Sequence, residues 1–242
     1  MERARLAPQV NRDRRCLLDP FDPVFVAQAI AQAVWKTPYS VLDNAISDLG
    51  NTACGEWPPA GVGSQLAQKL AAGSTYVCSP LYSLMNTSFV VVGALMLLGL
   101  YLTRKAWPRR RLTTWGFAFF ALAGLGKIIV GFAPENSRLL IHAFGALGIP
   151  CASIGILLIG LAVWQTRRQM AAFSVALGVI GLLGLLGGAV VTGLGHGHGA
   201  AERIADFPAI VWMVVLGSSF VWASRPAATS IVSATMTPGE SN

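Results

Sequence analysis

One lysine in this chain lies within an otherwise apolar stretch. Lys127 interrupts the run at 112–132, which has no other charged residue. A charge inside a bilayer is costly and usually faces the interior of a helix bundle or a water-filled cavity. Its long stem could instead carry the ammonium group outward to the interface. If Lys127 stays inside, the partner we expect is an outer carboxylate such as Asp48, Glu135 or Glu202.

The three histidines of the chain, His142, His196 and His198, are candidate metal ligands. Zinc sites use three or four His, Cys or carboxylate ligands, which these histidines with Asp48 or Glu202 would supply. No HExxH or paired CxxC motif supports such a site, and glycine-flanked histidines are more often solvated. The primary expectation is therefore no cofactor and no assigned catalytic residue. A membrane-embedded, zinc-dependent hydrolase is kept as the alternative.

A third feature is the polar turn YSVLDNAISDLGN at 39–51. Ile46 and Leu49 can face apolar neighbours while Ser47 and Asp48 present polar groups. Gly50 permits a turn that a side chain would resist. Two interpretations stay open: a capped turn at the membrane interface, or a polar plug that lies over a helix bundle and contacts a ligand.

The elements that position these residues follow from composition. Hydrophobic residues make up 54% of the 242 residues and charged residues only 12%, with a mean hydropathy of +0.57. Soluble domains carry about 25% charged residues. The net charge of +7 does not indicate nucleic-acid binding, because the basic residues flank apolar stretches instead of forming a stripe. We predict an all-α, polytopic transmembrane helix bundle.

Crossing the hydrocarbon core takes about 20 mostly apolar residues in a helix. Five stretches meet this requirement, although the last is short, and a sixth at the start is shorter and more polar. The predicted spans are 21–35, 84–102, 112–132, 139–164, 171–192 and 208–222. They form one domain over 21–222, between a basic tail at 1–20 and a disordered tail at 223–242.

Loop charges predict the orientation of these spans. Arg and Lys residues gather in the first tail, around 104–111, at 167–168 and at 225, whereas the alternate loops hold most of the acids. The positive-inside rule then places both termini in the cytoplasm. This alternation needs an even number of spans, so it favours six over five.

The long outer loop at 36–80 contains two cysteines, Cys54 and Cys78. The non-cytoplasmic side of a membrane permits disulfides. We therefore predict a Cys54–Cys78 bridge, which would close a loop of about 25 residues and stabilise the fold by roughly 3 kcal/mol. Cys16 and Cys151 are expected to be unpaired.

Small residues and a proline predict how the helices pack. Glycines recur at three- and four-residue spacing in the span at 171–192, on one face formed by Gly178, Gly181, Gly184 and Gly188. Such a face lets helix backbones approach closely, most simply within the chain and alternatively as the seam of a homodimer. Pro150 should kink the span at 139–164.

Four stretches, YSVLDNAISDLGN, CSPLYSLMNTSFVVVG, PENSRLLIHAFGA and GLGHGHGAAER, resemble the membrane family called domain of unknown function 998 (DUF998). The resemblance covers about 39–222. It implies a six-span protein of a bacterial or archaeal plasma membrane. It also implies a distant similarity to Frag1/DRAM/Sfk1-type membrane proteins, which are linked to lipids and membrane stress. It implies no reaction.

The leading functional hypothesis is a non-enzymatic module that binds or senses a lipid or small amphiphile through an outer-facing polar pocket. A pocket with both charge signs beside an apolar bundle suits a lipid headgroup, and arginine suits phosphate or carboxylate. The residues expected to line it are Asp48, Lys127, Glu135, Arg138, His142, Glu202 and Arg203. The expected partners are membrane lipids. Besides the hydrolase, a small transporter is an alternative, although no inverted repeat supports it.

Overall fold

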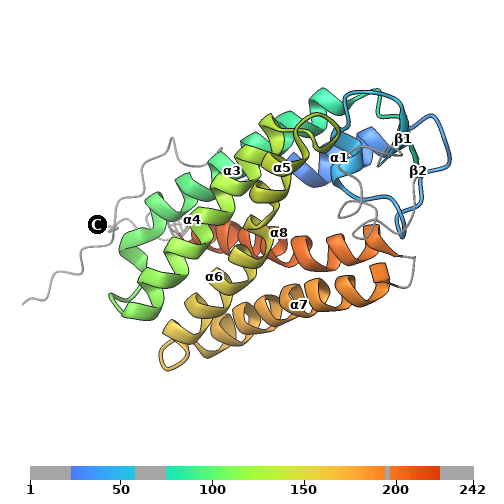
Figure 1. Cartoon of the computed structure of the whole chain (residues 1–242). Coiled ribbons are helices and arrows are strands. Elements are labelled where there is room, and N and C mark those ends of the chain that lie inside the picture. The colour runs from blue at the N-terminus through green and yellow to red at the C-terminus, as the bar shows by residue number, and fades with distance from the viewer. Residues whose placement is uncertain (1–22, 58–74, 194–196, 224–242) are drawn as a thin grey trace, which may run out of the picture.

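The computed structural model of the chain describes residues 23–57, 75–193 and 197–223. Nearly all of both predicted tails, together with Cys16 and His196, lies outside these residues. Helices dominate the described part, and the only sheet within it has two short strands. Figure 1 shows the helices packed side by side, with the strands at one end of the bundle.

Five long helices form the bundle, which confirms the predicted all-α, polytopic membrane fold. Each is long and apolar enough to cross a membrane. Neighbours along the chain pack against each other, and α4 also packs along α6. The helices are α3 (Tyr82–Thr103), α4 (Arg111–Phe132), α5 (Glu135–Ala146) continued by α6 (Gly148–Val163), α7 (Arg168–Gly193) and α8 (His198–Ala223).

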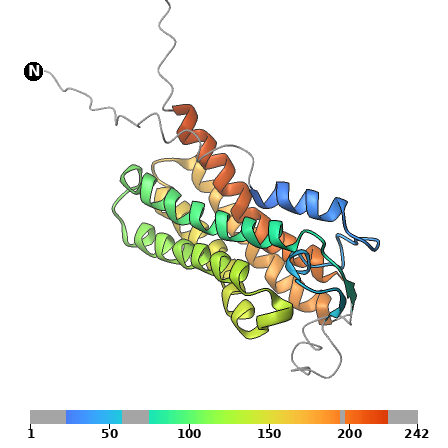
Figure 2. The same ribbon diagram turned by 90° about the horizontal axis from the view of Figure 1, so that it is seen from above.

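The first apolar segment forms only a short helix, α1 (Pro23–Ala33), of 11 residues. At about 1.5 Å per residue these described residues cover roughly half of the hydrocarbon thickness. Val24, Ala27 and Ala31 are buried, and α1 packs against α3 near the strand end of the bundle (Figure 2). Among the described residues, five helices rather than the expected six have spanning length. The predicted first span at 21–35 stays a prediction, because residues 21 and 22 lie outside the described part of the chain.

The basic connections lie together at the end of the bundle opposite the strands (Figure 1). The α3–α4 connection contains the 3-10 helix η3 (Arg104–Ala106), and Arg167 of the α6–α7 connection donates to the Ala106 carbonyl at 3.3 Å. Two of the arginine-rich segments therefore share one face, as the charge pattern requires. That this face is cytoplasmic stays a prediction.

The third long helix is broken, as Pro150 predicts. Leu147 separates α5 from α6, three residues before the proline. Proline has no N–H to donate to the carbonyl four residues back, and its ring clashes with that carbonyl, so the helix cannot continue straight through this turn. A second irregularity occurs within α5, where Arg138 has the non-helical angles φ −142° and ψ 56°.

The glycine face of α7 is occupied by helices of the same chain. A Cβ atom built on Gly178 would lie 2.8 Å from the Ser153 carbonyl oxygen of α6, and one built on Gly184 would lie 2.7 Å from the Ala205 nitrogen of α8. One built on Gly188 would lie 2.9 Å from the Ala201 Cβ. The glycines therefore serve close packing within the chain, as the simpler expectation had it, and the homodimer stays a prediction.

The outer loop carries the described sheet and the predicted disulfide. Strands β1 (Gly55–Trp57) and β2 (Thr75–Val77) pair antiparallel, with Gly55 opposite Val77. Cys54 and Cys78 flank this pair and are bonded, which confirms the expected bridge. Among the described cysteines Cys151 is free, also as expected.

Candidate functional site at the strand end of the bundle

The polar turn folds into a plug over the strand end of the bundle; we call residues 40–51 the plug. It contains the short 3-10 helix η2 (Ser47–Gly50). Ile46 and Leu49 are fully buried, as their spacing predicts. The Asp48 carboxylate accepts from the Ala45 backbone N–H at 2.9 Å and so stabilises the start of this turn.

Three residues outside the plug form hydrogen bonds with its backbone. Glu202 of α8 accepts a hydrogen bond of 2.6 Å from the Ile46 N–H. Asn86 of α3 donates to the Gly50 carbonyl at 2.9 Å, and the Ser79 hydroxyl donates to the Leu49 carbonyl at 2.7 Å. Backbone groups that would otherwise be buried without a partner are thus satisfied by the bundle.

Arg203 of α8 holds the first half of the plug. Its guanidinium donates to the carbonyls of Val41 and Asn44, at 3.0 and 2.8 Å, and to the Tyr39 hydroxyl. Tyr39 is largely buried, and this burial raises its pKa from 10.0 to about 12. Arg203 is a buried positioning residue whose two terminal nitrogens donate to the plug and its surroundings, whereas its Nε has no partner among the described residues.

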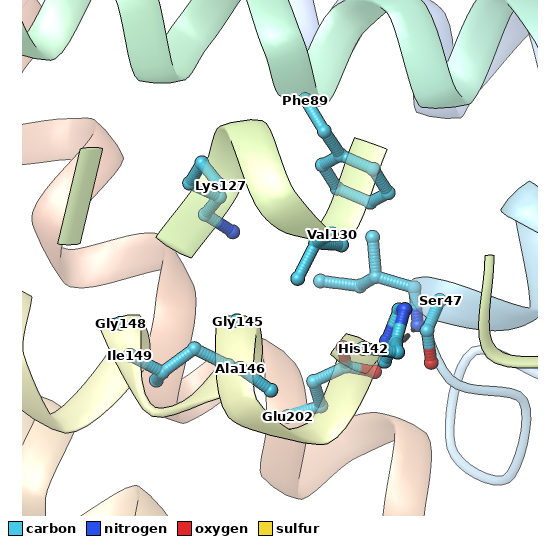
Figure 3. Close-up of a pocket in the computed structure, with 11 residues that line it drawn as sticks. Ser47, Phe89, Lys127, Val130, His142, Gly145, Ala146, Gly148, Ile149 and Glu202 are labelled. Atoms are coloured by element: carbon cyan, nitrogen blue, oxygen red, sulfur yellow. Dashed lines mark hydrogen bonds between the residues drawn. The ribbon is translucent and has the colours of Figure 1, made fainter. Parts of the chain in front are cut away.

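Beneath the plug lies a small polar chamber. Its volume is about 20 Å³, enough for one water molecule. Lys127 enters it from α4, His142 from α5 and Glu202 from α8 (Figure 3). The remaining lining comes from Ile46, Ser47, Phe89, Val130, Gly145, Ala146, Gly148 and Ile149.

Lys127 forms a salt bridge with Asp206 of α8, with 2.6 Å between Nζ and Oδ2. The Asp206 side chain is 3% exposed and that of Lys127 14%. Asp206 belongs to the acidic loops from which a partner was expected, although it is not one of the three carboxylates named as examples. Asp206 was missed because the last span was predicted to begin at Pro208. The helix begins ten residues earlier, at His198, and brings Glu202 and Asp206 onto adjacent turns of its outer end.

His142 is buried and oriented by the backbone. Its Nδ1 lies 2.8 Å from the Ala133 carbonyl oxygen, a contact in which the ring nitrogen must be the donor. In the neutral ring this leaves Nε2 as a hydrogen-bond acceptor. His142 thus belongs to the chamber, as predicted.

Glu135, at the start of α5, is the acidic neighbour of the plug. Its carboxyl group lies within hydrogen-bonding reach of Asp48 and Ser47. Glu135 is 9% exposed, and its Oε1 has no partner among the described residues. Burial also raises the pKa of Asp48, so the two carboxyl groups are poor candidates for simultaneous ionisation.

Two predicted positions lie elsewhere. Arg138 is exposed and does not line the chamber, because the backbone break at this residue removes the helical register that would place it beside His142. His198 is exposed at the start of α8, and His196 lies outside the described residues. Within the described part of the chain, no three His, Cys, Asp or Glu side chains are grouped to hold a metal ion.

The fold and the site define an integral membrane protein with a plugged polar chamber at one end of its helix bundle. The chain belongs to the family described as protein of unknown function (DUF998), whose model matches residues 23–219. The match includes the plug, all chamber residues and the whole bundle except the last four residues of α8. No curated protein and no solved structure matches the chain.

Proposed function

We propose that the chain is a membrane module that binds the headgroup of a zwitterionic lipid or similar small amphiphile at its outer end. The observation that carries the proposal is the composition of the chamber. It brings Lys127, His142 and Glu202 together with the apolar side chains of Phe89 and Val130. Opposite charges side by side suit a headgroup that has both a phosphate and an ammonium group.

Lys127 is the cation that would meet the phosphate. Arg203, the other buried cation near the chamber, is already engaged by the plug and by Tyr39. The Lys127 ammonium has one carboxylate partner, Asp206, and three N–H donors, so it can accept a second anionic ligand. Glu202 would then receive the ammonium of the ligand.

Binding requires the plug to move. A chamber of about 20 Å³ accommodates one water molecule and excludes a headgroup. The side chains of Leu140, Phe144 and Leu147 are exposed on the outside of α5 and the α5–α6 break, where acyl chains would lie. We place the protein in the plasma membrane of a prokaryote with the plug outside, an orientation supported by the loop charges. The resemblance to lipid-linked six-span proteins adds to the proposal.

The test is mass spectrometry of lipid that co-purifies with the full chain in mild detergent. We expect a zwitterionic lipid near equimolar amount with the wild type and its loss from the double variant Lys127→Gln, Asp206→Asn. This pair of changes removes both charges but keeps two hydrogen-bonding side chains in place. The matched control is Arg138→Ala, which alters an exposed cation outside the chamber.

Two results would overturn the proposal. One is a wild-type protein that retains no lipid above the level of a detergent blank. The other is equal retention by the wild type and the double variant, because the lipid would then be bound to the outer surface of the bundle.

A further inference from the structure

We infer that Asp48 and Glu135 share one proton and that this proton locks the plug closed over the chamber. The inference rests on the proposed function in one respect, since the lock would control access to the same chamber. Asp48 belongs to η2 in the plug, whereas Glu135 begins α5, so a bond between them joins the plug to the bundle.

Geometry supports a shared proton. Asp48 is 6% exposed and Glu135 is 9% exposed, and their carboxyl groups are within hydrogen-bonding reach. Two carboxylates can form such a bond only when one of them carries a proton. The proton can lie on Glu135 and be donated to Asp48, which already accepts from the Ala45 N–H.

The surrounding charges favour retention of that proton. Glu202 of α8 faces Glu135 and adds a second nearby carboxylate. His198, at the start of α8, acts in the opposite direction. Its charge favours the ionised form of Asp48. Asn44 and Ser47, both in the plug, are the neutral hydrogen-bonding neighbours of the pair.

Loss of the proton would place two like charges at the joint between plug and bundle. Like charges at this distance in a buried site repel strongly, and Glu135 Oε1 has no donor in the described structure to offset the new charge. Because the folded pair holds this proton more tightly than the unfolded chain would, the closed state is favoured at low pH and loses that advantage as pH rises. Alkaline conditions should therefore release the plug.

The test measures access to a cysteine placed inside the chamber. Val130 lines the chamber and is buried, so Val130→Cys in a Cys16→Ala, Cys151→Ala background gives one reporter thiol, the Cys54–Cys78 pair being bonded. The protein is held in nanodiscs and treated with a charged, membrane-impermeant thiosulfonate. The rate of labelling is compared at a mildly acidic pH of about 5.5 and a mildly alkaline pH of about 8.5.

The matched variant is Glu135→Gln in the same reporter background. The glutamine amide can still donate to Asp48 but has no proton to lose. Ionisation of the reporter thiol raises both rates equally, so the ratio between the two proteins isolates the lock. We expect the labelling rate to rise more from low to high pH in the protein that keeps Glu135 than in the Glu135→Gln variant. The two increases should differ by a factor of at least about ten, which corresponds to roughly 1.4 kcal/mol.

Equal pH responses in the two proteins would overturn the lock, as would a reporter that stays unlabelled at both pH values. Asp48→Asn tests the other partner and should also flatten the response. His198→Gln should keep the pH response of the labelling rate. If this variant lost the response, the titration would belong to the histidine. Both proteins are compared in the same nanodisc lipid, and their pH responses can differ whether or not a lipid binds in the chamber, so the lock and the lipid-binding proposal can fail separately.

Discussion

Lys127 of α4 and Asp206 of α8 form an ion pair of 2.6 Å beneath the plug, although 79 positions separate them in the chain. The pair joins two helices that are not neighbours in sequence and places a cation at the wall of the chamber. Both groups are largely shielded from water, so each depends on the other for compensation of its charge.

Removal of one member of this pair should be far more damaging than removal of both. Asp206→Ala leaves the Lys127 ammonium buried without its counterion, which we expect to destabilise the protein by about 3–5 kcal/mol. The double variant Lys127→Met, Asp206→Leu should recover most of that loss. Thermal unfolding in detergent, followed by circular dichroism, measures both. Similar midpoints for the single and double variants would show that the pair is not coupled.

Arg203→Lys should loosen the plug while leaving the bundle folded. A lysine ammonium cannot reach both the Val41 and Asn44 carbonyls and the Tyr39 hydroxyl in the way the planar guanidinium does. Loss of these charge-assisted bonds should lower the free energy of local opening by about 1.5–3 kcal/mol. Hydrogen exchange of the plug amides, followed by mass spectrometry, reads this opening. Arg138→Lys, at an exposed site, is the control and should leave the exchange rates unchanged.

Tyr39 should ionise only in strongly alkaline solution. Burial raises the pKa of its phenol from 10.0 to about 12 in the folded protein. The folded state therefore holds this proton more tightly than the unfolded state. The resulting stability is fully present below pH 10 and is lost as pH rises through about 12. The difference in phenolate absorbance between wild type and Tyr39→Phe isolates this one group. A midpoint near the usual value, as in the denatured protein, would contradict the buried environment.

Two glycines of α7 provide a matched pair for testing the close approach of α7 and α8. A Cβ on Gly184 would meet the backbone of Ala205 at 2.7 Å, whereas one on Gly187 would meet nothing within 4 Å. Gly184→Ala should therefore cost about 1–3 kcal/mol through overpacking. Gly187→Ala should be neutral or slightly stabilising, because alanine favours the helix. Equal unfolding midpoints for the two variants would exclude this packing.

Several features followed from local sequence alone. The apolar runs predicted the five long helices because each run exceeds what a soluble core needs and its backbone can be satisfied only within a helix. Pro150 predicted the break between α5 and α6, and the two outer cysteines predicted their bridge. Each of these predictions needs only the properties of neighbouring residues, or the presence of two cysteines in one loop.

The start of α8 could not be predicted from the local sequence. The run from His198 to Asp206 is polar and rich in small residues, so the span was predicted to begin only at Pro208. The structure continues the helix back to His198, because Arg203 satisfies carbonyls of the plug and Asp206 neutralises Lys127. Polar side chains are tolerated at this depth since each has a buried partner from another segment.

The amino-acid sequence by itself therefore determined which segments are helices, where the third long helix breaks and which residue types gather near the plug. Only the tertiary structure decided that Lys127 pairs with Asp206, that Arg203 holds the plug, and that Asp48 meets Glu135. The reason is physical: a helix is stabilised by bonds between residues four apart, whereas the contacts of Arg203 with the plug cross up to 162 positions. Such partners are chosen by how whole helices pack.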